Sequence, residues 1–96
     1  MGMYHSKMEC AQVDKLFDAL LSLHTREECY RFFDDVATIG EIQSLAQRMQ
    51  VAVMLAQGVT YAVIAETTGA STATISRVNK CLHYGADGYK TVLDRI

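Results

Sequence analysis

The segment 60–82, which reads TYAVIAETTGASTATISRVNKCL, constrains the fold more than any other part of this chain. Apolar side chains recur at helical spacing on both sides of Gly69, so the spacing predicts two short helices joined at this glycine. Gly69 tolerates the positive φ at which a chain reverses, and Ala65 is small enough for two helices to cross closely. The segment therefore predicts a helix-turn-helix, an arrangement that can place its second helix in the DNA major groove.

The second of these helices has two different faces. Ile75, Val78 and Leu82 recur on one side and are expected to pack it against the first helix. Ser71 is a natural N-cap for this helix. The opposite face carries Ala73, Ser76, Arg77, Lys80 and Tyr84. Helix pairs joined by glycine also occur in all-helical proteins that never touch DNA, so the spacing alone leaves a DNA-binding role and a purely structural role open.

Composition predicts a single small all-α domain. The chain has 96 residues, half of them apolar, and no proline, so it can bury a core and contains no strong helix breaker. Its three cysteines, Cys10, Cys29 and Cys81, form no CxxC pair. They therefore predict neither a zinc site nor a disulfide framework, and a reducing, cytoplasmic environment is expected. The three histidines lack ligand spacing, and no apolar run is long enough to span a membrane.

The net charge of −2 is unusual for a DNA-binding domain, since most are basic. The acidity lies in the amino-terminal half. Residues 1–45 hold 8 acidic and 4 basic side chains, whereas residues 46–96 hold 3 acidic and 5 basic ones. Glu66 is the only acidic residue between Gly58 and Tyr84. The helix-turn-helix is therefore locally basic, although each subunit has few cations for phosphate contacts, and a dimer would double their number.

Three further helices are expected before this motif. Apolar side chains at helical spacing predict the first helix over residues 6–24. Thr25 with Glu28 is a capping-box pattern that opens a second helix, and Thr38 with Glu41 repeats the pattern before a third helix over about residues 39–57. The apolar positions that define the first two helices are Val13, Leu16, Phe17, Leu20, Leu23, Cys29, Phe32, Phe33 and Val36.

The third helix predicts a dimer. Its later half contains the run VAVMLA over residues 51–56, which is apolar on every side. A helix without a polar face must be enclosed, and a chain this short has too few helices to enclose it alone. A tightly wrapped monomer is the alternative. The expected apolar stripe of this helix comprises Ile42, Leu45, Ala46, Met49, Ala52 and Ala56.

A short amphipathic helix is expected to close the chain. Gly85 is the expected stop of the preceding helix and Asp87 the expected N-cap of the last one, in which Tyr89, Val92, Leu93 and Ile96 follow the helical period. The single domain is thus predicted to comprise dimerisation helices over 1–57, the helix-turn-helix over 58–84 and a closing helix over 85–96.

The order of helices and the run GASTATISRVNKCL at residues 69–82 resemble the Trp repressor superfamily, specifically its YerC/YecD-like branch. The motif GAxxATIxR within this run is fairly specific, and the resemblance covers most of the chain. It implies a six-helix fold that forms an intertwined homodimer, whose two recognition helices face successive major grooves of a double-stranded operator.

The resemblance also implies which residues contact DNA. The base-facing positions of the family fall on Thr72, Ala73 and Ser76, whose hydroxyl and methyl groups can meet base edges directly or through ordered water. Phosphate contacts, which set register without reading sequence, are expected from Thr60, Tyr61 and Lys80. Ser71 and Arg77 complete the expected DNA-binding set.

An effector pocket is the second site that the resemblance implies. In tryptophan-responsive members two arginines sandwich the indole ring and a threonine lies nearby, and the matching positions here are Arg48, Arg77 and Thr38. The glycine that follows the second arginine in those members is Val78 in this chain. Its branched side chain occupies space that the indole needs. We therefore expect that tryptophan is not the effector, and that the protein either binds DNA without a ligand or uses another small molecule.

The function expected from the sequence is that of a DNA-binding transcriptional regulator, most simply a repressor, that requires no cofactor. No nucleophile, base and orienting group occur together, and no Gly-rich phosphate loop precedes a helix, so no catalytic residues are expected. A dimeric protein-protein interaction module that does not bind DNA is the alternative, because the basic content is low.

Overall fold

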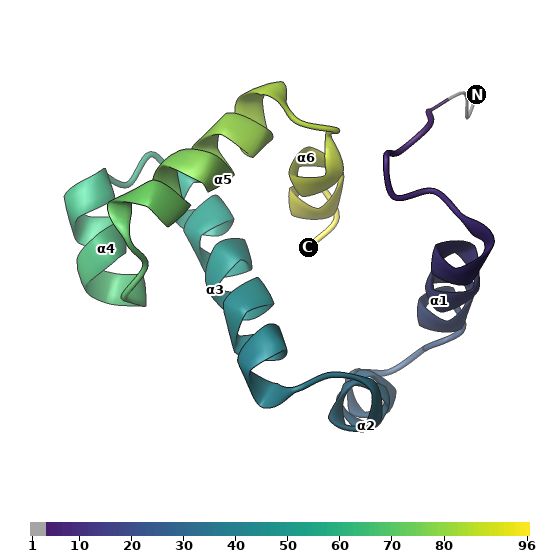
Figure 1. The fold of residues 1–96 in the computed structure, drawn as a ribbon. Helices are drawn as coiled ribbons and strands as arrows, with labels where there is room; N and C mark the ends of the chain where they lie inside the picture. The colour runs from purple at the N-terminus through teal and green to yellow at the C-terminus, as the bar shows by residue number, and fades with distance from the viewer. Residues whose placement is uncertain (1–3) are drawn as a thin grey trace. The chain divides into compact units, whose positions relative to one another are not determined.

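The computed structural model describes residues 4–96, and the described residues form six helices and no strand. The all-α fold class is therefore confirmed. Figure 1 shows the helices along the chain. Their bounds are α1 Ala11–Leu21, α2 Arg26–Val36, α3 Ile39–Ala56, α4 Tyr61–Thr68, α5 Thr72–Tyr84 and α6 Gly88–Leu93.

The chain divides into two compact units, Met1–Thr38 and Ile39–Ile96. The first contains α1 and α2, and the second contains α3 to α6. The helix α3 thus shares its unit with the helix-turn-helix, whereas the sequence grouped residues 1–57 as dimerisation helices. That grouping concerns contacts with a second chain and stays a prediction.

The first helix is shorter than residues 6–24. At its amino-terminal side the Ser6 hydroxyl accepts from the Met8 backbone N–H (3.1 Å) and the Ser6 carbonyl accepts from the Glu9 N–H (3.2 Å). These bonds hold a turn in place of the first helical turn. At the other end the Ser22 hydroxyl donates to the Ala19 carbonyl (2.6 Å), beyond the last helical residue, Leu21.

The second and third helices begin where the capping patterns predict. The Thr25 hydroxyl accepts from the Glu28 backbone N–H (3.1 Å), and the Glu28 carboxylate accepts from the His24 N–H (2.7 Å). One unpaired amide in the first turn of α2, and the amide of the residue before its N-cap, are thereby satisfied. The third helix begins at Ile39, directly after Thr38.

No described residue of the first unit is buried. Both helices expose large apolar side chains; Leu21 is 81% exposed and Tyr30 67% exposed. The edge-to-face contact between the rings of Phe32 and Phe33, whose centroids lie 5.4 Å apart, still leaves both rings half-buried. This unit therefore has no core of its own.

The core of the second unit lies where α4 and α5 pack against the carboxyl-terminal half of α3. Figure 1 shows these three helices together, with α6 beside them. The predicted inward positions Ile75, Val78 and Leu82 of α5 are all buried, so this prediction is confirmed, and Ile64 of α4 is buried with them. The buried core cluster comprises Val51, Ala52, Ile64, Ala70, Ile75 and Val78.

The apolar stripe expected on α3 is not the face that packs within the chain. Of its members only Ala52 is buried, and Leu45 is 54% exposed. The helices α4 and α5 instead cover the later half of α3, where Val51 and Ala52 are fully buried and Met54 and Leu55 pack against the core. Three of the six members of the predicted stripe, Leu45, Ala46 and Ala56, are thus exposed in a single chain.

The turn of the helix-turn-helix is fixed by hydrogen bonds around Gly69. This glycine has φ 74°, and its backbone N–H donates to the Ala65 carbonyl (2.9 Å). The Thr68 hydroxyl donates to the Ile64 carbonyl (2.8 Å) and accepts from the Ala70 N–H (3.1 Å). The Gln47 side chain donates from α3 to the Thr68 carbonyl (3.1 Å), which ties the turn to the third helix.

Gly85 follows the last residue of α5, as predicted. Glycine is needed here because a side chain would have no room, and not because the backbone has a positive φ. Its backbone is extended, and a Cβ at this position would collide with the Cys81 carbonyl. Asp87 occupies the N-cap position of α6, yet its side chain makes no capping hydrogen bond. The reason is its left-handed backbone, with φ 66°; its carboxylate lies 3.9 Å from the Lys90 ammonium instead. Ile96 lies beyond the end of α6.

Replacing Gly69 with alanine should lower the free energy of unfolding by about 1 kcal/mol, because an L side chain is strained at this positive φ. No atom would obstruct the new Cβ, so the effect isolates the backbone conformation. Gly40→Ala is the matched control. It lies in α3 with no atom near the new Cβ, and should leave stability unchanged or raise it slightly. Urea unfolding of both variants measures the difference; equal effects of the two substitutions would contradict the role assigned to Gly69.

Candidate nucleic-acid interface and adjoining cavities

The outward face of α5 is exposed along its length. Because Ile75, Val78 and Leu82 are buried against the core, the helical period turns the opposite positions toward solvent. The residues of the predicted reading surface on this helix, Thr72, Ala73, Ser76, Arg77 and Lys80, are all exposed. The structure therefore brings these five positions onto one accessible surface.

Three other expected DNA contacts lie at helix starts. The Ser71 hydroxyl accepts from the Thr74 backbone N–H (3.1 Å) and caps α5. The Thr60 hydroxyl accepts from the Val63 N–H (3.4 Å) and caps α4. Tyr61, the first residue of α4, is 37% exposed. The two capping hydroxyls thus have a structural role that the sequence analysis assigned only to Ser71.

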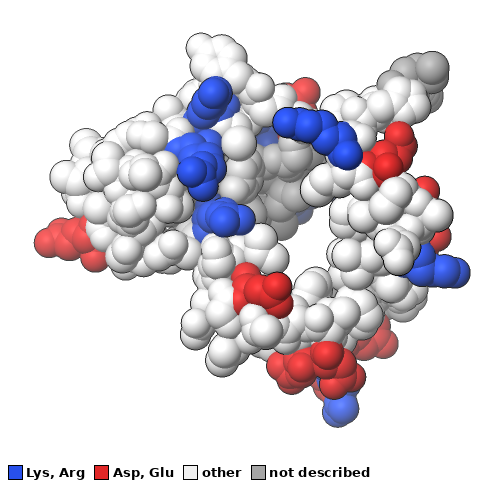
Figure 2. All heavy atoms as spheres, viewed as in Figure 1, with Lys and Arg blue, Asp and Glu red and all other residues white. Residues whose placement is uncertain are grey.

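The exposed face of α5 is locally cationic. Arg77 and Lys80 are exposed, and within the described residues neither pairs with a carboxylate. Figure 2 shows Lys and Arg side chains gathered over α5 and the adjoining part of α3. A cation without a local partner can accept a phosphate without first breaking an ion pair, so this surface suits a polyanion.

A cavity of about 210 Å³ lies beside the reading helix. It brings together three of the four residues expected to form an effector pocket, namely Arg48 of α3 with Arg77 and Val78 of α5. The fourth, Thr38, belongs to the first unit and is not among the lining residues. Sequence reasoning missed Thr74, Cys81 and Tyr89, which also line the cavity.

The helical period could have identified two of the missed residues. Thr74, Arg77, Val78 and Cys81 follow the spacing i, i+3, i+4 and i+7, which places them along one side of α5. Tyr89 comes from α6, and no pattern in the sequence places that helix against this side. Four of the six lining residues thus follow from the spacing along α5, and two come from other helices by tertiary packing.

Tyr89 is the titratable group of this region with a perturbed pKa. Burial raises the pKa of its phenol, the neighbouring Cys81 thiol raises it further, and Arg48 partly offsets both effects. The phenol therefore remains a neutral hydroxyl at pH 7. The charged side chains that line the cavity are both cationic, so the chemistry of its walls favours an anionic or electron-rich occupant.

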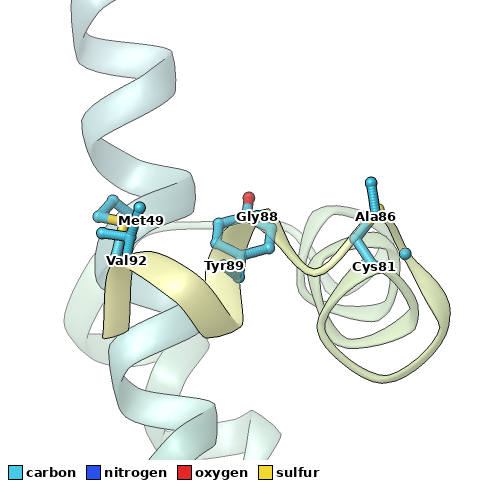
Figure 3. Close-up of a pocket in the computed structure, with 7 residues that line it drawn as sticks. Met49, Cys81, Ala86, Gly88, Tyr89 and Val92 are labelled. Atoms are coloured by element: carbon cyan, nitrogen blue, oxygen red, sulfur yellow. The ribbon is translucent and has the colours of Figure 1, made fainter. Parts of the chain in front are cut away.

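A second, larger cavity of about 490 Å³ adjoins the first. Figure 3 shows its walls, which come from α3, the end of α5, and α6 with the preceding loop. Cys81 and Tyr89 line both cavities, so they form part of the wall between them. The other lining residues are Met49, Gly85, Ala86, Gly88 and Val92. No charged side chain lines this second cavity.

The described residues also bear on membrane and metal binding. No helix there is long and apolar enough to cross a membrane. Within the same range, no three His, Cys, Asp or Glu side chains are grouped so that they could hold a metal ion. Cys10, Cys29 and Cys81 are free thiols.

Comparisons with known proteins place this geometry in a family. The family model described as Trp repressor protein matches residues 11–96. The uncharacterized protein YerC of Bacillus subtilis (strain 168) is 60% identical over 90 residues, which cover 94% of this chain and 86% of YerC. The resemblance stated from the motif at residues 69–82 is thereby confirmed.

Two solved structures share the fold. A candidate Trp repressor from Staphylococcus aureus matches with a TM-score of 0.88 and 60% identity, over 93% of this chain and 89% of that one. A TrpR-like protein from Eubacterium eligens ATCC 27750 matches with a TM-score of 0.89 and 57% identity, over 93% and 92% of the two chains. The chain belongs to the Trp repressor family.

Proposed function

We propose that the protein is a sequence-specific, double-stranded DNA-binding regulator that acts as a homodimer, most simply as a repressor, and does not respond to tryptophan. One observation carries this proposal: α5 is held in a helix-turn-helix by a fully buried face while its opposite face presents exposed cations and hydroxyls. Membership of the Trp repressor family supports DNA regulation as its class of function.

The exposed residues suit two kinds of DNA contact. The methyl and hydroxyl groups of Thr72, Ala73 and Ser76 can meet thymine methyls and base edges in the major groove. Lys80, with Tyr61 at the start of α4, supplies donors for phosphate oxygens. The cap geometry leaves the hydroxyls of Ser71 and Thr60 partly occupied within the protein, so these residues contact phosphate mainly through the helix starts that they organise.

Homodimerisation would cover the apolar surface that a single chain exposes. The first unit has no buried residue among those described, and α3 exposes Leu45 and Ile39. Exposed apolar surface of this extent marks an interface. A two-fold dimer would present two copies of α5 to half-sites about 34–36 Å apart and double the few cations of one chain. An operator that overlaps a promoter would then be blocked when occupied, which is the simplest route to repression.

The cavity beside α5 supports the proposal that tryptophan is not the effector. Val78 lines it and is only 2% exposed, so its branched side chain is held in place by the core. It cannot move aside without opening a void among fully buried neighbours, and such voids are costly. Either the cavity needs no occupant for DNA binding, or the occupant is a different small molecule held by Arg48 and Arg77.

A dimeric interaction module without DNA binding is the second candidate. The observation that favours it is the large exposed apolar surface on a chain whose net charge is −2. The two functions differ in their salt response, because phosphate contacts weaken steeply with salt whereas an apolar protein interface does not.

Selection of genomic fragments by the purified protein should recover a preferred duplex that binds less tightly as salt rises. Thr72→Ala should reduce the preference for that duplex by about 1 kcal/mol, the equivalent of one neutral hydrogen bond. Lys80→Ala should weaken binding to every sequence and lower the slope of log K against log salt by about 1. Lys15→Ala, an equal loss of charge from α1, is the control and should change neither. Recovery of no duplex, or binding insensitive to salt, would favour the interaction module.

Leu45→Glu should dissociate the dimer, because it would place an unpaired carboxylate in the apolar interface. The expected loss is about 3 kcal/mol or more, at least a hundredfold in the dimer dissociation constant. Gln50→Glu introduces the same carboxylate on the same helix at an exposed position outside the predicted stripe, and should leave the dimer intact. Sedimentation equilibrium distinguishes the two variants, and a monomeric wild-type protein at all concentrations would contradict the proposed homodimer.

Calorimetric titration of the wild-type protein with tryptophan should show no saturable binding at micromolar affinity, since Val78 occupies the indole space. Val78→Ala should admit the ring and give measurable heat of binding. Val63→Ala removes the same atoms from an exposed position on α4 outside the cavity, and should behave like the wild type. Saturable micromolar binding to the wild-type protein would overturn this part of the proposal.

A further inference from the structure

Two hydroxyl groups interlock at the start of α5. The Ser71 hydroxyl accepts from the Thr74 backbone N–H and donates its own proton to the Thr74 hydroxyl oxygen, each at 3.1 Å. Both bonds thus join the same two residues. An N-cap hydroxyl that only accepts has no partner for its own proton within the protein, whereas here the Ser71 hydroxyl has the Thr74 hydroxyl as a second partner. The orientation of the cap therefore depends on where Thr74 holds its oxygen.

The surroundings of Thr74 restrict that oxygen. Its side chain is half-buried and lines the smaller cavity with Arg48 and Arg77. Threonine in a helix divides between two χ1 rotamers, because its hydroxyl can also bond a carbonyl of the preceding turn. The bond from Ser71 favours the rotamer that directs the oxygen to the cap. Without the Thr74 hydroxyl, neither the χ1 rotamer of residue 74 nor the orientation of the Ser71 hydroxyl would be restrained by this bond.

The turn fixed by this pair carries base-facing residues. Thr72 and Ala73 lie between the two hydroxyls in the sequence, and both are exposed. Hydrogen bonds to base edges weaken steeply with small changes of angle and distance. Phosphate contacts are more tolerant, because much of their strength is electrostatic. A looser first turn should therefore impair the reading of bases more than the overall attraction to DNA.

We propose that Thr74 is a positioning residue for base reading, which sets sequence discrimination from the cavity side of α5 by orienting the Ser71 cap. This inference rests on the proposed DNA-binding function. The same side chain lines the smaller cavity and bonds the cap of the reading turn, so Thr74 adjoins both.

Thr74→Val tests the proposal, because valine keeps the shape and β-branching of threonine but removes the hydroxyl. Dissociation constants are measured for the selected duplex and for a scrambled duplex of equal length at one salt concentration. Thr74→Val should lower the ratio of the scrambled-duplex dissociation constant to the selected-duplex dissociation constant about fivefold, the equivalent of one neutral hydrogen bond. The scrambled duplex should still bind within about twofold of wild type. Thr74→Ser keeps the hydroxyl and should restore most of the ratio.

A double-mutant cycle with Ser71→Ala separates coupling from simple loss of stability. In the Ser71→Ala background, Thr74→Val should have no further effect on the ratio. An unchanged ratio in Thr74→Val, equal weakening on both duplexes, or additive effects in the double variant would each overturn the role of Thr74. Thermal melts verify that each variant is folded at the assay temperature. If Thr74→Val is unfolded there, Thr74→Ala takes its place and is judged by the same criteria. A wild-type protein that selects no duplex would instead overturn the proposed function itself, and this inference with it.

Discussion

The packing of α4 and α5 on the later half of α3 is the contact on which the rest of the second unit depends. Val51, Ile64 and Ile75 come from three different helices and are fully buried against one another. Complete burial of one such side chain contributes about 1.5–3 kcal/mol, so this small cluster holds the crossing of the two short helices. It also decides which side of α5 faces outward. The reading surface is thus a consequence of the core, since its residues are those that the core excludes.

Much of this arrangement could be predicted because it is encoded locally. The caps of α2 and α5 depend on neighbours within a few residues, and so do the positive φ of Gly69 and the inward period of α5. The prediction was incomplete or wrong where tertiary contacts or competing local hydrogen bonds determine the structure. The face of α3 that packs within the chain could not be predicted, because its later half is apolar on every side and only the tertiary contacts of α4 and α5 select Val51. The start of α1 was mistaken because the Ser6 hydroxyl stabilises a turn.

The smaller cavity shows why the candidate site could be only partly predicted. Its α5 wall follows from helical spacing, but Tyr89 comes from α6, beyond Gly85, which lies too close to the Cys81 carbonyl for any side chain. Val78 adds a second constraint, since it lines the cavity and belongs to the core cluster. A substitution there changes the space available to a ligand and the stability of the helix-turn-helix at once. Ligand preference and stability at this position therefore cannot evolve independently.

The absence of buried side chains among the described residues of the first unit also bears on protein synthesis. A ribosome releases these residues before α3 to α6 exist, and chains emerge at about 5–20 residues per second. For several seconds the apolar side chains of α1 and α2 have no core to join. Neighbouring ribosomes on one messenger expose the same segment at the same time, so for the proposed homodimer the earliest available partner would be another nascent copy. Pairing during translation would place assembly ahead of folding for this part of the chain.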